Sequence, residues 1–135
     1  MRIHLSRYTW PTGTTFRRSG TTAGSLFRRV GLIGVPEDRN SSFLRGCAAA
    51  PALIREAYKS PAFNTYSELG IDVSAHMRDY GDACLSPAAH DHAALLQSVQ
   101  PLVARAVREG HFPLALGGDH SVSYALVKSL GEALG

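Results

Sequence analysis

The sequence has few cysteines and no long apolar run, and both absences narrow the class of protein. Cys47 and Cys84 are the two cysteines of the chain, too few for a scaffold held by disulfides, and they fit a reducing compartment. No run of about 18 consecutive apolar residues occurs, so we expect no membrane-spanning helix and no membrane partner. With 44% hydrophobic and 19% charged residues, the composition is that of one globular domain with a buried core.

Acidic residues are missing from the first 36 positions. This segment carries six arginines and a charge of +6, whereas the other 8 basic and 11 acidic residues give −3. We interpret residues 1–28 first as a disordered extension or a misassigned start, and an organelle transit segment, which they resemble, is the alternative. We therefore expect a cytoplasmic protein, with a mitochondrial location as the alternative. Because the arginines are not interleaved with aromatic residues of a folded surface, we expect no nucleic-acid partner.

Two apolar runs separated by a helical pattern predict an α/β domain over residues 29–135. Residues 30–35 and 112–116 are short, rich in aliphatic residues and bounded by turn signals, as buried strands are. Apolar residues at helical spacing predict helices over 52–58, 93–110 and 122–134. A strand, a helical crossover and a second strand are most simply parallel. A further short strand is predicted over 77–80, and Pro101 is expected to kink or split its helix.

The most informative stretch follows the apolar run 112–116. Gly117 and Gly118 free the backbone for a sharp turn or a close approach, and Asp119 and His120 can bind metal or move protons. Ser121 is expected to cap the following helix. Polar residues at the carboxyl end of a strand are how an open α/β sheet forms a binding crevice. The alternative is a turn in which Asp119 bonds backbone N–H groups and His120 packs as a neutral ring.

The run His90-Asp91-His92 looks like a second metal cluster but does not have suitable spacing. On a helix, residues two positions apart point about 200° away from each other, which hinders joint ligation. We therefore interpret Asp91 as the cap of the helix that follows, and Gly110 as its terminator.

Taken together, several segments in order resemble the ureohydrolase family of arginases, agmatinases and formiminoglutamases. The most specific is Gly117-Gly118-Asp119-His120-Ser121 after its strand. The others are residues 31–36, Arg45-Gly46, residues 51–55 and residues 79–82. The resemblance extends from about Arg29 to the end of the chain.

This resemblance implies a three-layer α/β/α fold with a mainly parallel sheet and two Mn²⁺ ions, acting on a small guanidino or amidine substrate. It makes His120 a direct metal ligand, Gly117, Gly118 and Asp119 the structural support of that turn, and residues 79–82 structural. It also implies a homo-oligomer when the protein is complete. Manganese favours carboxylate, water and imidazole donors, so Cys47 and Cys84 are not expected to be ligands.

The sequence also departs from the family. The family takes its remaining ligands from an Asp-x-His-x-Asp segment and a later Asp-x-Asp segment, and neither is present here. One imidazole cannot hold a metal pair, so we expect an amino-terminal part of a ureohydrolase domain that is inactive alone and leaves a bare strand edge. The substrate is left open, and the polar loop 40–46 is either a substrate contact or plain surface.

Two other classes of function compete with a hydrolase represented by a fragment. One is a short nonenzymatic product that pairs with full-length subunits. The other is an unrelated metal-dependent phosphoesterase, since Gly-Asp turns occur there. The spacing of Asp91-His92 and Asp119-His120 counts against that class, which should show Asp-x-His after an early strand.

Overall fold

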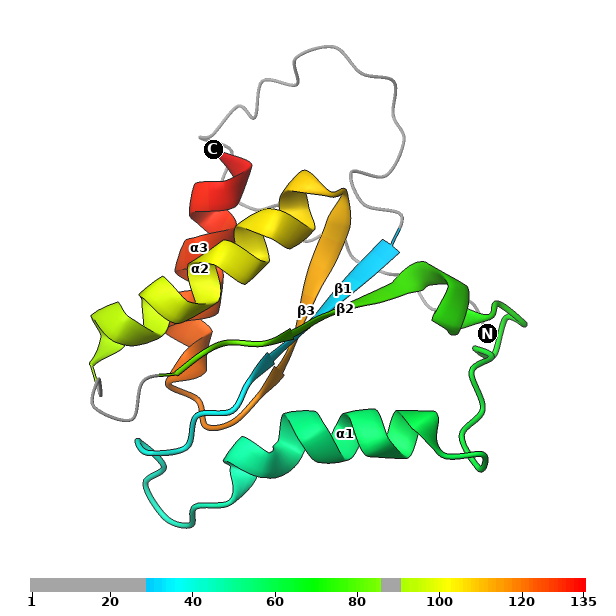
Figure 1. The fold of residues 1–135 in the computed structure, drawn as a ribbon, viewed down its shortest axis with the longest axis horizontal. Coiled ribbons are helices and arrows are strands. Elements are labelled where there is room, and N and C mark those ends of the chain that lie inside the picture. Colours follow the sequence, from blue (N-terminus) through cyan, green and yellow to red (C-terminus); the bar gives the residue numbers. More distant parts are fainter. Residues whose placement is uncertain (1–28, 86–90) are drawn as a thin grey trace, which may run out of the picture.

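Three parallel strands form the centre of the protein (Figure 1). The computed structural model describes residues 29–85 and 91–135, so the predicted leader 1–28 and His90 lie outside the described residues. The strands are β1 (Arg29–Val35), β2 (Met77–Asp82) and β3 (His111–Gly117), in the order β2-β1-β3. The predicted strands 30–35, 77–80 and 112–116 are therefore confirmed, each with longer ends.

The central strand β1 is parallel to both of its neighbours. Its pairing with β3 is regular, from Arg29 opposite His111 to Val35 opposite Gly117. Its pairing with β2 shifts register between Leu32 and Gly34. Parallel pairing brings the carboxyl ends of all three strands to the same edge of the sheet. The segments that follow β1 and β3 consequently meet at that edge.

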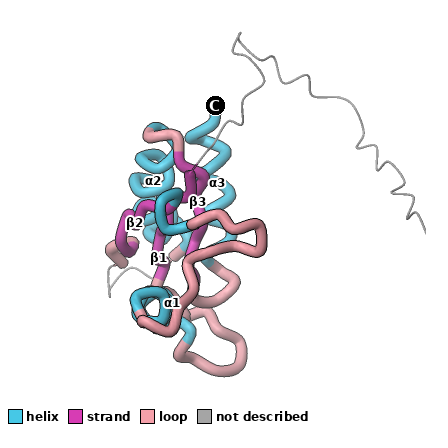
Figure 2. Tube along the Cα trace, turned by 90° about the vertical axis from the view of Figure 1, so that its right-hand side faces the viewer, coloured by secondary structure: helices cyan, strands magenta, loops and turns pink. Residues whose placement is uncertain are grey.

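Helices cover both faces of the sheet, which gives three layers (Figures 1 and 2). Helix α1 (Ala50–Lys59), preceded by the short 3-10 helix η1 (Cys47–Ala49), lies on one face. Helices α2 (His92–Arg108) and α3 (Val122–Leu134) lie side by side on the other. A second 3-10 helix, η2 (Val73–His76), leads into β2. The expected three-layer α/β/α fold is present, with a sheet of three strands in the described part of the chain.

The hydrophobic core fills the space between the sheet and the α2–α3 pair. Alternate side chains of β1 point into it, and Ile33 and Val35 are completely buried. They meet the apolar face of α2 and the start of α3. The other buried members of this cluster are Ala83, Leu95, Val99, Val103, Ala106, Val122 and Ala125.

The opposite face of the sheet is less well covered. Phe112 and Leu114 of β3 alternate with inward-facing residues and are 48% and 45% exposed. Beside α1 a groove of about 470 Å³ opens onto this face, lined mainly by apolar side chains. Strand β3 is an edge strand among the described residues, as the sequence led us to expect.

Helix α2 is not split at Pro101. A kink or split was expected there, and the helix runs from His92 to Arg108 as one element. Proline leaves the carbonyl of Gln97 without its helical donor. Both Pro101 and Gln97 are exposed, so water can serve that carbonyl. The ends of the helix match the prediction: the Asp91 carboxylate accepts from the Ala94 N–H at 2.8 Å, and Gly110 turns the chain with φ +77°.

No helix in the described part of the chain is both long and apolar enough to cross a bilayer.

Within residues 29–85 and 91–135, one buried side-chain polar group is unpaired. Ser129 of α3 is fully buried, and its hydroxyl has no hydrogen-bond partner among the described residues. By contrast, the half-buried Ser98 hydroxyl of α2 donates to the Ala94 carbonyl at 3.0 Å. A buried hydroxyl without a partner keeps its desolvation cost, so Ser129 weakens the fold.

We predict that Ser129→Ala raises the free energy of unfolding by about 1 kcal/mol, because the substitution removes an unpaired hydroxyl and favours the helix. Ser98→Ala is the matched control, since it has the same change in helix propensity but loses a hydrogen bond. Urea unfolding of the 135-residue chain, followed by circular dichroism, measures both. The interpretation is contradicted if Ser129→Ala does not raise the free energy of unfolding more than Ser98→Ala does.

Candidate functional site

The candidate metal ligand His120 lies in the turn between β3 and α3, at the carboxyl edge of the sheet. Its side chain is exposed, and its Nδ1 lies 3.3 Å from the Ser123 hydroxyl on the first turn of α3. The ring is therefore not packed into the interior. The imidazole is available to a ligand or to a further part of the protein.

The two glycines before His120 have different surroundings. A Cβ atom built on Gly118 would lie 1.7 Å from the carbonyl oxygen of Glu37, far inside contact distance. One built on Gly117 would lie 3.3 Å from a methyl group of Val122. Gly118 is thus required by the close approach of two backbones, whereas Gly117 is only tightly packed.

Asp119 forms hydrogen bonds with two segments of backbone. Its carboxylate accepts from the Ser121 N–H at 2.8 Å and from the Asn40 N–H at 2.9 Å. Its own amide donates to the Glu37 carbonyl at 2.8 Å. Asp119 therefore bonds backbone N–H groups, as the satisfied-turn alternative expected, while His120 beside it stays exposed.

Ser121 does not have the role that we expected from the sequence. It stands before α3, but its side chain makes no capping bond to the helix. Its hydroxyl donates instead to the Asp119 carboxylate at 2.5 Å. An ionised carboxylate is a strong acceptor for a hydroxyl proton, and this bond orients the serine side chain toward Asp119 rather than toward the helix N–H groups.

Glu37 was not singled out from the sequence, yet it is the buried acid of this edge. Its side chain is 4% exposed and pairs with the Arg39 guanidinium. It also accepts from the Arg39 backbone N–H at 2.8 Å. These bonds from Arg39 lower the pKa of the Glu37 carboxyl against the opposing effect of burial. An acid and an arginine two positions apart just after the strand-ending Pro36 were the available signal.

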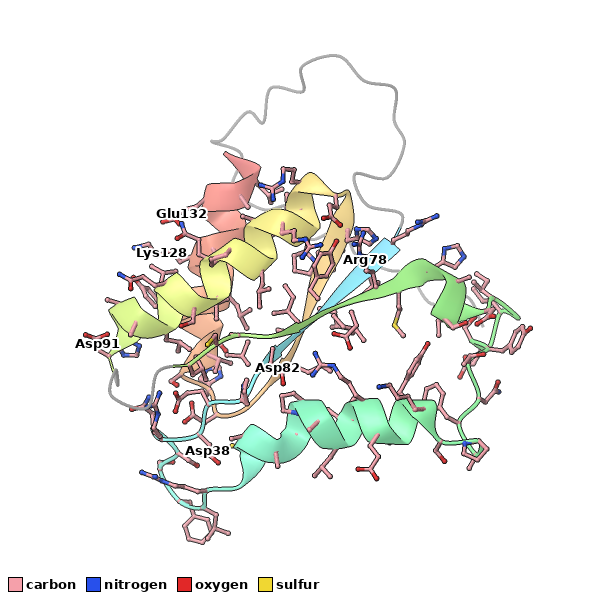
Figure 3. The ribbon with its side chains drawn as sticks, in the orientation of Figure 1. Asp38, Arg78, Asp82, Asp91, Lys128 and Glu132 are labelled. Carbon is pink, nitrogen blue, oxygen red and sulfur yellow. The ribbon has the colours of Figure 1, made fainter. Side chains whose placement is uncertain are left out.

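The loop that follows Glu37 is organised by a second carboxylate. Asp38 accepts from the backbone N–H groups of Gly46 and Ala48, at 2.6 and 3.2 Å, and these bonds lower its pKa. Figure 3 places Asp38 in the loop that leads to α1. The Arg45-Gly46 segment of the resemblance therefore closes this loop, with Gly46 at φ +121°.

A separate charged cluster links α1 to β2. Arg55 of α1 donates to both Asp79 oxygens, at 2.6 and 2.9 Å, and to Asp82 at 2.5 Å. Asp82 projects where β2 passes over α1 (Figure 3). Burial opposes ionisation of Asp79, but the bonds from Arg55 and the Gly81 N–H outweigh it and lower its pKa. Two segments of the family resemblance, 51–55 and 79–82, therefore contact each other directly.

The described residues do not form a complete metal site. They contain no group of three or more His, Cys, Asp or Glu side chains placed to share an ion. His120 offers one imidazole, a donor that manganese accepts, and His92 is exposed with its ring against Tyr124. Cys47 and Cys84 are both free thiols. A metal pair does not fit these residues alone.

A parallel sheet between helices, with polar residues at its carboxyl edge, is the arrangement of α/β proteins that bind ligands at that edge. The chain belongs to the arginase family, whose family model matches residues 28–135.

Individual relatives agree with this assignment. The chain is 35% identical to mitochondrial arginase 1 of Arabidopsis thaliana, in an alignment that covers 90% of this chain and 40% of that protein. The solved arginase from Medicago truncatula is 31% identical with a TM-score of 0.64, over 78% of this chain and 35% of that chain. The solved agmatine ureohydrolase of Thermoplasma volcanium is 30% identical with a TM-score of 0.60, over 80% of this chain and 36% of that chain. The chain spans about two fifths of the length of such relatives.

The contact at Gly118 generates a prediction about stability. Gly118→Ala should lower the free energy of unfolding by about 3 kcal/mol, because its new methyl group would force the Glu37 backbone away. Gly131→Ala is the matched control, since Gly131 lies in α3 with nothing within 4 Å of a built Cβ. We expect that control to gain about 0.5–1 kcal/mol from helix propensity. Urea unfolding of the 135-residue chain tests both, and equal stabilities would show that the two backbones do not touch.

The Glu37–Arg39 pair generates a prediction about pH. Because the pKa of Glu37 is lowered by folding, its contribution to stability is present above its ordinary value of about 4.5 and is lost as the pH falls through it and below. We expect the free energy of unfolding to fall between about pH 6 and pH 3. Glu37→Gln should lower stability at neutral pH and make this fall shallower. Urea unfolding at a series of pH values measures the free energy of unfolding of both proteins. The prediction is contradicted if this free energy falls as steeply with pH in Glu37→Gln as in the unaltered chain.

Proposed function

We propose that this chain is the amino-terminal part of a manganese-dependent hydrolase that cleaves a C–N bond of a guanidino or amidine compound, as an arginase or agmatinase does. Membership of the arginase family supports the reaction class. The names of the relatives, arginase and agmatine ureohydrolase, support a small guanidino substrate. Because the chain spans about 40% of such a relative, the activity is proposed for the whole protein.

The observation that carries this proposal is the position of His120. The turn Gly117-Gly118-Asp119-His120-Ser121 follows a buried parallel strand, and the imidazole is exposed at the carboxyl edge of the sheet. Its neighbour Asp119 is engaged with backbone N–H groups of two segments. A side chain held by its neighbours and left open to solvent suits a ligand that completes its coordination with residues from elsewhere.

The chemistry explains why more of the protein is needed. A guanidinium carbon is a poor electrophile and water is a poor nucleophile at neutral pH, and a bound metal pair supplies an activated water. The described residues provide a single imidazole donor for such a pair and no group of three candidate ligands. We therefore propose that the remaining donors and the substrate-binding loops belong to the rest of the domain, and that residues 1–135 alone are inactive.

The described residues supply the scaffold of this half of the site. The β1–β3 pairing sets the carboxyl edge, and the Glu37 carbonyl holds the Asp119 amide at 2.8 Å. Arg55 of α1 forms ion pairs with Asp79 and Asp82 of β2. The first two contacts support a preformed turn around His120, which would leave less ordering for the metal-binding step.

The protein encoded by the complete reading frame provides the test. With Mn²⁺ added, we expect release of urea from arginine, agmatine or guanidinobutyrate, or of formamide from formiminoglutamate. His120→Ala should lower the rate about 100-fold or more, because it removes a proposed ligand. His92→Ala is the control, since His92 is exposed at the start of α2 and should leave the rate unchanged. The proposal fails if the complete protein releases neither product, or if the two variants behave alike.

A further inference from the structure

Asn40 contacts both neighbours of His120, although it lies about 80 positions earlier in the sequence. Its backbone N–H donates to the Asp119 carboxylate at 2.9 Å. Its side-chain amide donates to the Ser121 hydroxyl at 3.3 Å. The residue between those two partners is His120. Asn40, which lies outside the β3–α3 turn, is therefore bonded to the residues on both sides of the candidate ligand.

The segment that carries Asn40 is itself fixed. Three residues earlier, the buried Glu37 carboxylate pairs with Arg39, and the Glu37 carbonyl accepts from the Asp119 N–H at 2.8 Å. Asp38 ties the far end of the loop through the Gly46 and Ala48 N–H groups. Asn40 thus stands on a loop held at both ends by carboxylates, and it can transmit that rigidity to the turn.

We propose that Asn40 is a positioning residue for His120. By holding Asp119 and Ser121 at once, it limits rotation of the intervening backbone and so fixes the direction in which the imidazole leaves the sheet. This role rests on the proposed function for its purpose, since a ligand that is already placed loses less freedom when it binds. It also gives the polar loop 40–46 a task other than contact with substrate.

The alternative is that Asn40 only stabilises the loop. Two asparagines of the chain allow the two roles to be separated. Asn64 also sits in an exposed turn, where its side chain accepts from the Tyr66 N–H at 3.0 Å. That bond is local, whereas those of Asn40 reach residues 79 and 81 positions away. Substitutions at Asn64 therefore measure the cost of losing an asparagine in a turn, without any effect on His120.

The experiment compares Asn40→Asp and Asn40→Ala with Asn64→Asp and Asn64→Ala in the 135-residue chain. The Asn40 side chain and the Asp119 carboxylate both bond the Ser121 hydroxyl. Asn40→Asp therefore brings a second carboxylate to the same hydroxyl, which like-charge repulsion disfavours. Asn40→Ala removes the bond to Ser121 and keeps the backbone N–H. Isotope-labelled samples report the imidazole carbon–proton cross-peak of His120 and the hydrogen exchange rates of the Asp119 and Ser121 amides.

We expect Asn40→Asp to move the His120 cross-peak and to accelerate exchange at the Asp119 and Ser121 amides about tenfold, because repulsion between the two carboxylates weakens the charge-assisted hydrogen bond from the backbone N–H of residue 40 to Asp119. Asn40→Ala should change both in the same direction by less. The two Asn64 variants should leave the cross-peak and both amides unchanged. A His120 cross-peak and amide rates in Asn40→Asp equal to those of the Asn64 variants would overturn the positioning role.

These readouts need neither metal nor turnover, so they separate this inference from the proposed function. If the complete protein releases no product while Asn40→Asp still moves the His120 signals, the reaction is rejected and the positioning role stands. If product is released and the His120 signals do not respond to Asn40, the positioning role is rejected and the reaction stands.

Discussion

The hydrogen bond from the Asp119 amide to the Glu37 carbonyl, at 2.8 Å, joins the ends of β1 and β3. It forms only because Gly118 has no Cβ, which would lie 1.7 Å from the same carbonyl oxygen. The contacts of Asn40 with Asp119 and Ser121 depend on this approach, and so does the exposed position of His120. The edge of the sheet that carries the candidate ligand is thus defined by one backbone contact between distant segments.

The fold could be predicted from the sequence to the extent that local patterns determine it. Aliphatic runs of strand length gave β1 and β3, because buried parallel strands need no alternation with polar residues. Asp91 and Gly110 marked the ends of α2 correctly, since capping chemistry is local. The expected alternative of a split at Pro101 is absent, because whether a proline ends a helix depends on whether the freed carbonyl of Gln97 reaches solvent. That is a property of the packed structure.

The site was predictable at His120 and its glycines but not beyond them. Glu37 and Asn40 were read only as part of a polar loop, since nothing in their local sequence tells which distant residues they meet. Ser121 looked like a helix cap, but its hydroxyl turns to the Asp119 carboxylate. The pairing of Arg55 with Asp79 and Asp82 was likewise hidden, although both segments had been noted separately. Contacts between segments far apart in sequence follow from the topology of the sheet.

The two layers of helices are attached to the sheet by different forces. Helices α2 and α3 bury a continuous apolar cluster, whereas α1 has Pro51 as its one buried residue and leaves Leu53 59% exposed. The Arg55 guanidinium, shared between the carboxylates of Asp79 and Asp82, attaches α1 to β2. Dissolved ions screen charged contacts near the surface, but they do not weaken apolar burial in the same way. Raising the ionic strength should therefore loosen α1 while α2 and α3 remain packed on the sheet. In a concentrated electrolyte, the face covered by α1 is the first to open.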